Sequence, residues 1–263
     1  NIAYVAAWDA GLQIIDVSNP QYPSFLGSYF FGGNGRSVFV SNNIAYVADE
    51  NSGLKIIDVS NPQNPALIVS YDTPGIALSV TVSNNIAYIT HENSGLQIID
   101  VTNPYNPALL GSYDTPGIAL SVTVSNNIAY VADEESGLQI IDVTNPYNPA
   151  LLSSYDTPGI ALSVTVSNNI AYVADAWAGL LIIDVYNSHN PVLLGSYNTP
   201  SFASSVFVSN NIVYVADRSG LQIIDVSNPQ NPALVGLYDT PGRAPSVFVS
   251  NNIAYVADDW AGL

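Results

Sequence analysis

The chain has 263 residues, of which 48% are apolar and 10% charged, and it carries a net charge of -17 because it has only four Lys and Arg. A chain of this length and apolar content buries a substantial core, which excludes a disordered polymer. The scarcity of basic residues argues against binding to nucleic acid or to anionic membranes, which both need basic patches.

The sequence contains no Cys and no Met. Without Cys, a disulfide framework, a thiolate metal site and a cysteine nucleophile are excluded. No apolar run approaches the roughly 20 residues that a membrane-spanning helix needs, so we expect no membrane insertion.

One motif, Asn-Ile-(Ala/Val)-Tyr, recurs along the whole chain and divides it into repeats. The spacing between its copies is 42 residues five times and 41 once. The repeats begin near residues 1, 43, 85, 127, 169, 211 and 252, and the last is incomplete. A fixed period of this length predicts one repetitive domain over residues 1–263.

Four strands are predicted in each repeat. Between them lie an Asn-Asn turn, a Gly-containing hairpin loop and a Pro-containing loop, and a fourth linker leads to the next repeat. In the second repeat the predicted strands are residues 37–40, 44–48, 54–59 and 66–71.

The strands are apolar on both faces, as expected when each small sheet packs between two others. Four antiparallel strands per repeat of about 42 residues predict an all-β fold of the β-propeller type.

The number of blades depends on the incomplete ends. Seven second strands favour seven blades, the last without its outer half. The alternative is six blades with an extra strand, in which residues 246–249 complete the sheet of residues 1–30. An unpaired edge is also a template for strand addition, so a third possibility is pairing with another chain in a polymer.

The third strand carries a family likeness. It reads Gly-Leu-Gln-Ile-Ile-Asp-Val from Gly11 to Val17 and Gly-Leu-Leu-Ile-Ile-Asp-Val from Gly179 to Val185. This strand resembles the LVIVD repeat, and the likeness covers essentially the whole chain. The resemblance implies a propeller in a bacterial or archaeal cell-surface or secreted protein, with no enzymatic activity and no catalytic residues.

One aspartate ends each complete third strand. Carboxylates at a loop suit Ca²⁺, whereas an Asx turn needs only the backbone N–H groups of the loop. A single Asp per repeat does not make a metal cage, so we expect no resident cofactor, with Ca²⁺ as the alternative. These residues are Asp16, Asp58, Asp100, Asp142, Asp184 and Asp225.

Aromatic and basic residues that depart from the repeat are the candidate ligand-binding residues. Trp8, Trp177 and Trp260 all fall in the loop between the second and third strands. Exposed Trp side chains suit sugar rings or a protein partner, although each could instead cap a neighbouring blade. Arg36 and Arg243 lie in the linkers between repeats, where they are candidates to hold an anionic group.

The same loops and linkers carry many carboxylates, which predicts an acidic face that attracts cations or a basic partner, or that only keeps the protein soluble. This set comprises Asp49, Glu50, Asp72, Glu92, Asp114, Asp133, Glu134, Glu135 and Asp156.

No set of residues that breaks the repeat converges as an enzyme requires, so we expect a non-catalytic protein. A constant scaffold with one variable loop face favours an extracellular or cell-surface module that binds protein or glycan. The alternative function is a structural subunit of a surface layer, sheath or filament, self-assembled through the incomplete blade.

Overall fold

The computed structural model describes residues 1–259 and 262, which form twenty-five strands and no helix. The described part of the chain therefore contains no helix suited to crossing a membrane. The chain forms two compact units, which are described separately. Unit 1 comprises residues 1–115 with 145–149, and unit 2 comprises residues 116–144 with 150–263. The single domain over residues 1–263 stays a prediction.

The strands fall into four classes by their order in the repeat. The first strands are β4 (Gly35–Ser41), β8 (Ala77–Ser83), β12 (Ser121–Ser125), β16 (Ser163–Ser167), β20 (Ala203–Ser209) and β24 (Ser246–Ser250). The second strands are β1 (Ile2–Ala6), β5 (Ile44–Asp49), β9 (Ile86–His91), β13 (Ile128–Ala132), β17 (Ile170–Ala174), β21 (Ile212–Asp217) and β25 (Ile253–Ala257). The third strands are β2 (Leu12–Asp16), β6 (Gly53–Asp58), β10 (Gly95–Asp100), β14 (Leu138–Asp142), β18 (Leu180–Asp184) and β22 (Gly220–Asp225). The fourth strands are β3 (Ser24–Tyr29), β7 (Ala66–Tyr71), β11 (Ala108–Tyr113), β15 (Ala150–Tyr155), β19 (Val192–Tyr197) and β23 (Ala233–Asp239).

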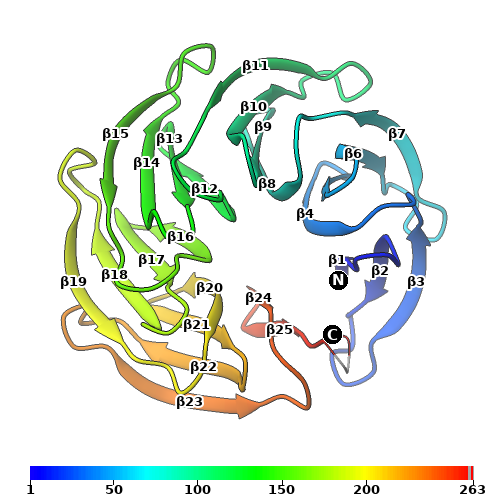
Figure 1. Ribbon diagram of the computed structural model, residues 1–263. Coiled ribbons are helices and arrows are strands. Elements are labelled where there is room, and N and C mark those ends of the chain that lie inside the picture. The colour runs from blue at the N-terminus through cyan, green and yellow to red at the C-terminus, as the bar shows by residue number, and fades with distance from the viewer. Residues whose placement is uncertain (260–261, 263) are drawn as a thin grey trace. The chain divides into compact units, whose positions relative to one another are not determined.

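These strands build the four-stranded antiparallel blades of a β-propeller, as predicted (Figure 1). Five sheets have four strands in chain order, the first sheet is β1-β2-β3, and β24 pairs with β25 in a sheet of two. The described residues thus form six blades and a two-stranded sheet, which matches the alternative strand count. The favoured prediction of seven blades is therefore corrected to six. The reason is that β24 and β25 are the only strands in the described part of the seventh repeat.

The Asn-Asn turns join the first and second strands of a blade. Asn126 and Asn127 have φ values of 52° and 59°, and Ser125 pairs with Ile128 across the two-residue loop. Both central residues with positive φ define the type I′ turn, whose twist suits the flanking strands. Asn tolerates this left-handed conformation better than other side chains, which explains why the pair recurs.

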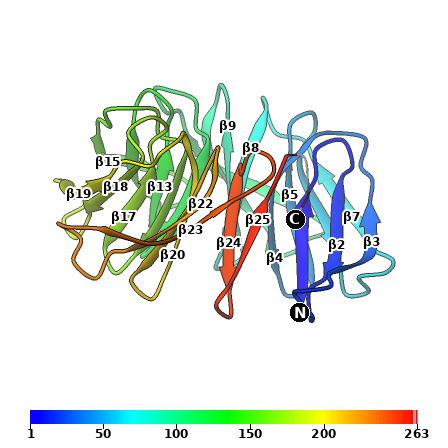
Figure 2. The ribbon, with the colours of Figure 1, turned by 90° about the horizontal axis from the view of Figure 1, so that it is seen from below.

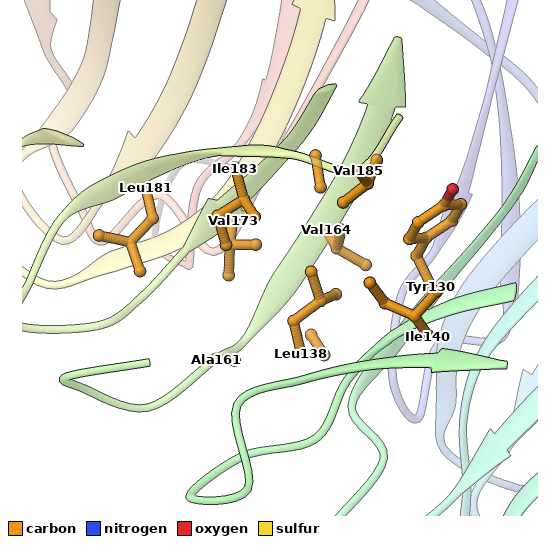
Figure 3. Packing of buried hydrophobic residues seen from close by; sticks show 11 residues of the cluster. Tyr130, Leu138, Ile140, Ala161, Val164, Val173, Leu181, Ile183 and Val185 are labelled. Carbon is orange, nitrogen blue, oxygen red and sulfur yellow. The ribbon is translucent and has the colours of Figure 1, made fainter. Parts of the chain in front are cut away.

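Neighbouring blades pack face to face through apolar side chains. In unit 2, Tyr130, Leu138 and Ile140 lie against Val173 and Ile183 of the next blade (Figure 3). The third and second strands are buried on both faces, as the lack of strict alternation predicts. Each blade therefore presents one apolar face to each neighbour.

The fourth strands bend at a bulge where a loop of the following blade approaches closely. The register shifts between Ile182 and Ile183 opposite β19, where Gly195 pairs with Ile182. A Cβ atom on Gly195 would lie 2.3 Å from the carbonyl oxygen of Pro229. In the blade before, Ser153 occupies the same repeat position and its hydroxyl donates a hydrogen bond to the carbonyl of Ser188.

Candidate functional site

The loops at the two ends of a blade differ in composition. One end, called here the hairpin end, carries the hairpins between second and third strands and the linkers from each fourth strand to the next first strand. The opposite end, the turn end, carries the Asn-Asn turns and the Pro-containing loops. Figure 2 shows the strands from the side, with the β24–β25 turn at the turn end. Among the described residues, the predicted binding residues Trp8, Trp177, Arg36 and Arg243 belong to the hairpin end.

A row of buried acidic side chains lies beneath the hairpins. Asp49, Asp133, Asp175 and Asp217 have no solvent exposure. The prediction that Asp49 and Asp133 belong to an exposed acidic face is therefore wrong. Asp49 ends β5 and Asp133 directly follows β13, so packing between blades removes both side chains from water.

In unit 2 these carboxylates accept hydrogen bonds from backbone N–H groups of the linkers, whereas Asp49 in unit 1 accepts from Asn51 and Ser52 of its own hairpin. The N–H of Gly117 lies 2.9 Å from Oδ2 of Asp133, and that of Gly159 lies 2.8 Å from Oδ2 of Asp175. Burial raises the pKa of Asp175, while hydrogen bonds from Thr157 and Gly159 oppose that rise. In unit 2 the row therefore fixes linkers to hairpins and supports the loops above it.

His91 replaces Asp at this repeat position in the third blade. Its imidazole is fully buried, and Nε2 lies 2.8 Å from Oγ1 of Thr73. Burial lowers the pKa of His91 to about 4, against smaller opposing contributions from the backbone of Gly95 and Ile89. The side chain is therefore neutral at pH 7 and supports the loops like its acidic counterparts.

In unit 1, Trp8 and Arg36 lie together as a cation–π pair. The Arg36 guanidinium carbon is 4.3 Å from the centroid of the Trp8 ring, which is 51% exposed. Arg36 also forms an ion pair with Glu50, and Nδ2 of Asn34 donates a hydrogen bond of 2.8 Å to Glu50. The guanidinium is thus partly neutralised by the Glu50 carboxylate.

The backbone at Trp8 is held in an unusual conformation. Its φ is 47°, and its N–H and C=O both bond to Gly35 of the next blade at 3.1 Å. A left-handed conformation is strained for a bulky residue and persists only when its surroundings fix it. The two hydrogen bonds position this residue beside the start of β4, which carries Arg36.

In unit 2, Trp177 stands beside two residues that were not among the predicted binding residues. Its ring meets that of Phe202 edge-on, with centroids 4.8 Å apart, and the Arg218 guanidinium carbon lies 4.1 Å from the Phe202 centroid. Trp177 remains 69% exposed. Trp177, Phe202 and Arg218 are called here the aromatic–arginine cluster.

A departure from the repeat is the signal by which this cluster can be found. Phe202 stands where other repeats have Ile76, Ile118 or Ile160, and Arg218 stands where three repeats have Glu. The N–H of Arg218 donates to the carbonyl of Phe202 at 3.2 Å, so these two positions are neighbours at the hairpin end of the sixth blade.

Arg243 takes the repeat position of Phe202 one blade later. It is exposed, and its carbonyl accepts the N–H of Asp259 at 3.0 Å. Trp260 lies outside the described residues. Because Trp8 and Trp177 belong to different units, the grouping of the three tryptophans stays a prediction.

The aspartates that end the third strands form Asx turns. In each of the six complete third strands, Oδ1 of this Asp accepts the N–H of the residue two positions on at 2.8 Å. Hydrogen bonds from Ser60 lower the pKa of Asp58, and Thr102 does the same for Asp100. Over residues 1–259 and 262, no three His, Asp or Glu side chains gather as a metal site.

The repeat matches a known protein family. A family model described as LVIVD repeat matches residues 1–30, 32–73, 74–115, 116–157, 158–199, 202–240 and 241–263. The chain belongs to the LVIVD repeat family. A search of curated proteins finds no match to it. The predicted family resemblance is confirmed.

Solved structures share the fold of this LVIVD repeat protein. A protein from Lactobacillus plantarum is 13% identical with a TM-score of 0.82, over 99% of this chain and 88% of that one. A functionally unknown protein from Desulfotomaculum acetoxidans is 14% identical with a TM-score of 0.75, over 91% and 80%. The computationally designed Ika8 protein is 14% identical with a TM-score of 0.73, over 97% and 77%. At these identities the likeness concerns the fold alone.

Proposed function

We propose that this LVIVD repeat protein is a non-catalytic, extracellular or cell-surface module that binds glycan or protein through the hairpin end, without a resident cofactor. The aromatic–arginine cluster carries the proposal. Trp177, which is 69% exposed, offers an apolar face, and Arg218 on the adjoining Phe202 ring offers hydrogen-bond donors. Aromatic faces stack on the apolar faces of sugars or anchor protein partners.

The buried row beneath the hairpins supports this assignment. Side chains that bind a ligand need a rigid frame, and Asp175 and Asp217 hold the linkers on either side of Trp177 by accepting N–H groups of Gly159 and Ser201. The cluster is therefore supported by buried hydrogen bonds rather than by loop contacts alone.

The test is binding of labelled protein to an array of immobilised oligosaccharides. We expect Trp177→Ala combined with Trp260→Ala to weaken binding by roughly tenfold or more, as for a truncated aromatic hot spot. Thermal stability should change little, because the Trp177 side chain is largely exposed. The matched control is Tyr186→Ala, which removes an 82% exposed aromatic ring from the turn end of the same blade.

Full binding by the double variant, or its unfolding, would overturn the role of the cluster. If the array binds no wild-type protein, the glycan class is wrong. Arg218→Ala then separates a contribution of the guanidinium from that of the rings, because it leaves Trp177 and Phe202 in edge-on contact.

A second candidate function is self-assembly as a structural subunit, and the open face of the sixth blade favours it. Val235 is 58% exposed and Tyr238 is 67% exposed. Their counterparts in the fifth blade, Leu194 and Tyr197, pack against the following blade. Apolar side chains that are buried at equivalent interfaces make this face suited to packing against a further sheet, which a second copy could supply.

A further inference from the structure

The repeat loses its carboxylates around the aromatic–arginine cluster. Ala176 and Arg218 occupy a hairpin position that is Glu in the second, third and fourth repeats. Trp177 stands where the fourth repeat has a further Glu, and Asn198 stands where four other linkers have Asp. The carboxylates at these positions elsewhere are Glu50, Glu92, Glu134, Glu135, Asp72, Asp114, Asp156 and Asp239. Four departures from the repeat thus remove negative charge from one place in a chain of net charge -17.

These departures lie side by side in unit 2. A Cβ atom on Gly179, in the hairpin of the fifth blade, would lie 3.0 Å from Cα of Asn198 in the following linker. The carbonyl of Ala176 accepts the N–H of Ala203 at 3.0 Å, where the same linker enters β20. The hairpin of the sixth blade, which carries Arg218, bonds to this linker through its backbone. One hairpin, one linker and the next hairpin therefore form a continuous surface with few carboxylates.

The free positive charge of the protein lies at the same end of unit 2. Of the four Lys and Arg side chains, Arg36 and Lys55 in unit 1 form ion pairs with neighbouring carboxylates. Arg218 and Arg243 are exposed, and neither forms an ion pair with another residue of the described ranges 1–259 and 262. The guanidinium of Arg218 is therefore available to an anion from solution.

We infer that the aromatic–arginine cluster binds a sugar that carries a carboxylate, such as a uronic or sialic acid. This inference rests on the proposed function and names the class of glycan. A guanidinium matches a carboxylate with two parallel N–H···O bonds, and an aromatic ring stacks on the apolar face of a sugar. The absence of the usual Glu and Asp side chains removes the repulsion that an acidic sugar meets elsewhere at the hairpin end.

Phe202 holds the two binding side chains in place. Its face carries the Arg218 guanidinium at 4.1 Å, and its edge meets the ring of Trp177, with centroids 4.8 Å apart. The N–H donors of a guanidinium point outward in its own plane, so stacking on a ring leaves them free to bind. Phe202 is therefore a positioning residue, while Trp177 and Arg218 contact the sugar.

The cation–π pair in unit 1 has the same residue types but lacks this free charge. Arg36 stacks on Trp8 and is also bonded to the Glu50 carboxylate. An acidic sugar would have to displace Glu50 from the guanidinium, which offsets the gain from a new ion pair. The two sites therefore differ in charge, and the inference concerns the cluster in unit 2 alone.

Paired oligosaccharides test the class of ligand. The full chain is applied to immobilised uronate- and sialate-containing oligosaccharides, each beside its carboxyl-reduced form, which has the same rings and linkages without the charge. Sulfated oligosaccharides are included on the same surface. We expect the carboxylate form to bind roughly tenfold or more tightly than its reduced partner, as a charge-assisted pair of hydrogen bonds provides.

Two variants assign the preference to the cluster. Arg218→Gln should remove the preference for the carboxylate form and leave binding of the reduced form nearly unchanged, because Trp177 is retained. Asn198→Asp restores the residue that four other linkers have, so it should fold normally and weaken binding of the carboxylate form. High salt should reduce the effect of Asn198→Asp, since Asn198 is exposed and salt screens charges at a surface.

The matched control is Gln230→Glu, which makes the net charge more negative by the same amount at the turn end of the sixth blade, where Gln230 is exposed. It should leave all binding unchanged, whereas an equal loss of preference in this control would assign the effect to net charge and overturn the site.

The outcomes separate the inference from the proposed function. Equal binding of the two forms, or a preference that Arg218→Gln retains, overturns the acidic class and leaves glycan binding by the cluster standing. Binding of sulfated sugars alone overturns the carboxylate in favour of a sulfate. Wild-type protein that binds none of the oligosaccharides, charged or reduced, overturns both.

Discussion

Single residues explain the constancy of the repeat where the backbone demands a special conformation. The Asn pairs occupy the two positions with positive φ in every turn between first and second strands, from Asn42 and Asn43 to Asn251 and Asn252. A left-handed conformation costs other L-residues roughly 1–2 kcal/mol each. The repeated Asn-Asn is therefore selected by turn geometry and needs no ligand to explain it.

Asn127→Ala tests this reading. The Cβ-bearing Ala lacks the local hydrogen bonding that lets Asn adopt φ of 59°, so we expect the free energy of unfolding to fall by about 1–2 kcal/mol. Denaturant titration measures this loss of free energy of unfolding. Asn127→Gly is the control and should be neutral or stabilising. Equal losses in both variants would show that the Asn side chain has another role.

His91 should make the protein sensitive to mild acid. Its pKa is about 4 in the folded state against an ordinary value of 6.5, so the unfolded chain binds the proton first as the pH falls. Stability is then lost progressively from pH 6.5 to pH 4, by about 3 kcal/mol in total. His91→Asn removes the titration, and the difference between the two proteins in urea midpoint against pH isolates the effect. A constant difference would contradict the assigned pKa.

At the scale of the element, the fourth strand is shaped by the blade that follows it. Gly195 and Gly236 occupy the same repeat position, but a Cβ atom meets the Pro229 carbonyl at 2.3 Å in the first case and only the Ile223 side chain at 3.5 Å in the second. The difference arises because the described seventh repeat has no third-to-fourth-strand loop. The same residue is thus constrained in one blade and free in another.

Gly195→Ala should therefore cost about 1–3 kcal/mol of stability, because the Pro229 loop must shift to admit a methyl group. Gly236→Ala should change stability by less than about 0.5 kcal/mol, as surface substitutions do. Thermal unfolding of both variants gives the comparison. If Gly236→Ala costs as much as Gly195→Ala, strand conformation rather than the approaching loop decides this position.

At the scale of the whole molecule, stability is distributed over the interfaces between neighbouring blades. Repeats that contact only their neighbours contribute nearest-neighbour terms, so an end of the series is weaker than its middle. Ile182 is fully buried between the fifth and sixth blades, whereas its counterpart Ile223 on the open face of the sixth is only partly buried.

Ile182→Ala should accordingly cost about 3–4 kcal/mol, in the range for a buried Ile, and Ile223→Ala should cost about half of that. Chemical denaturation at low protein concentration makes the comparison on monomers. Equal costs for the two substitutions would contradict this distribution of stability.

The sequence alone determined the local structure of this protein. The period of the Asn-Ile-Ala-Tyr motif, the Pro and Gly positions and the apolar third strand predict the strands to within a residue or two: residues 44–48 were expected where β5 runs from Ile44 to Asp49. These signals are local, since turn chemistry and strand propensity act over a few residues. The family resemblance, carried by one strand, was predictable for the same reason.

The tertiary structure decided which side chains are available. Asp49 and Asp133 look like exposed loop acids in the sequence, yet packing between blades buries both and makes Asp133 an acceptor for the distant N–H of Gly117. The contact of Arg218 with Phe202 depends on the pairing of a first strand with a second strand, and that of Arg36 with Trp8 depends on two blades meeting. Only the three-dimensional register brings such residues together. The pairing of β24 with β25 likewise fixed six blades and a two-stranded sheet, because identical strand sequences leave the choice of partner open until the chain is folded.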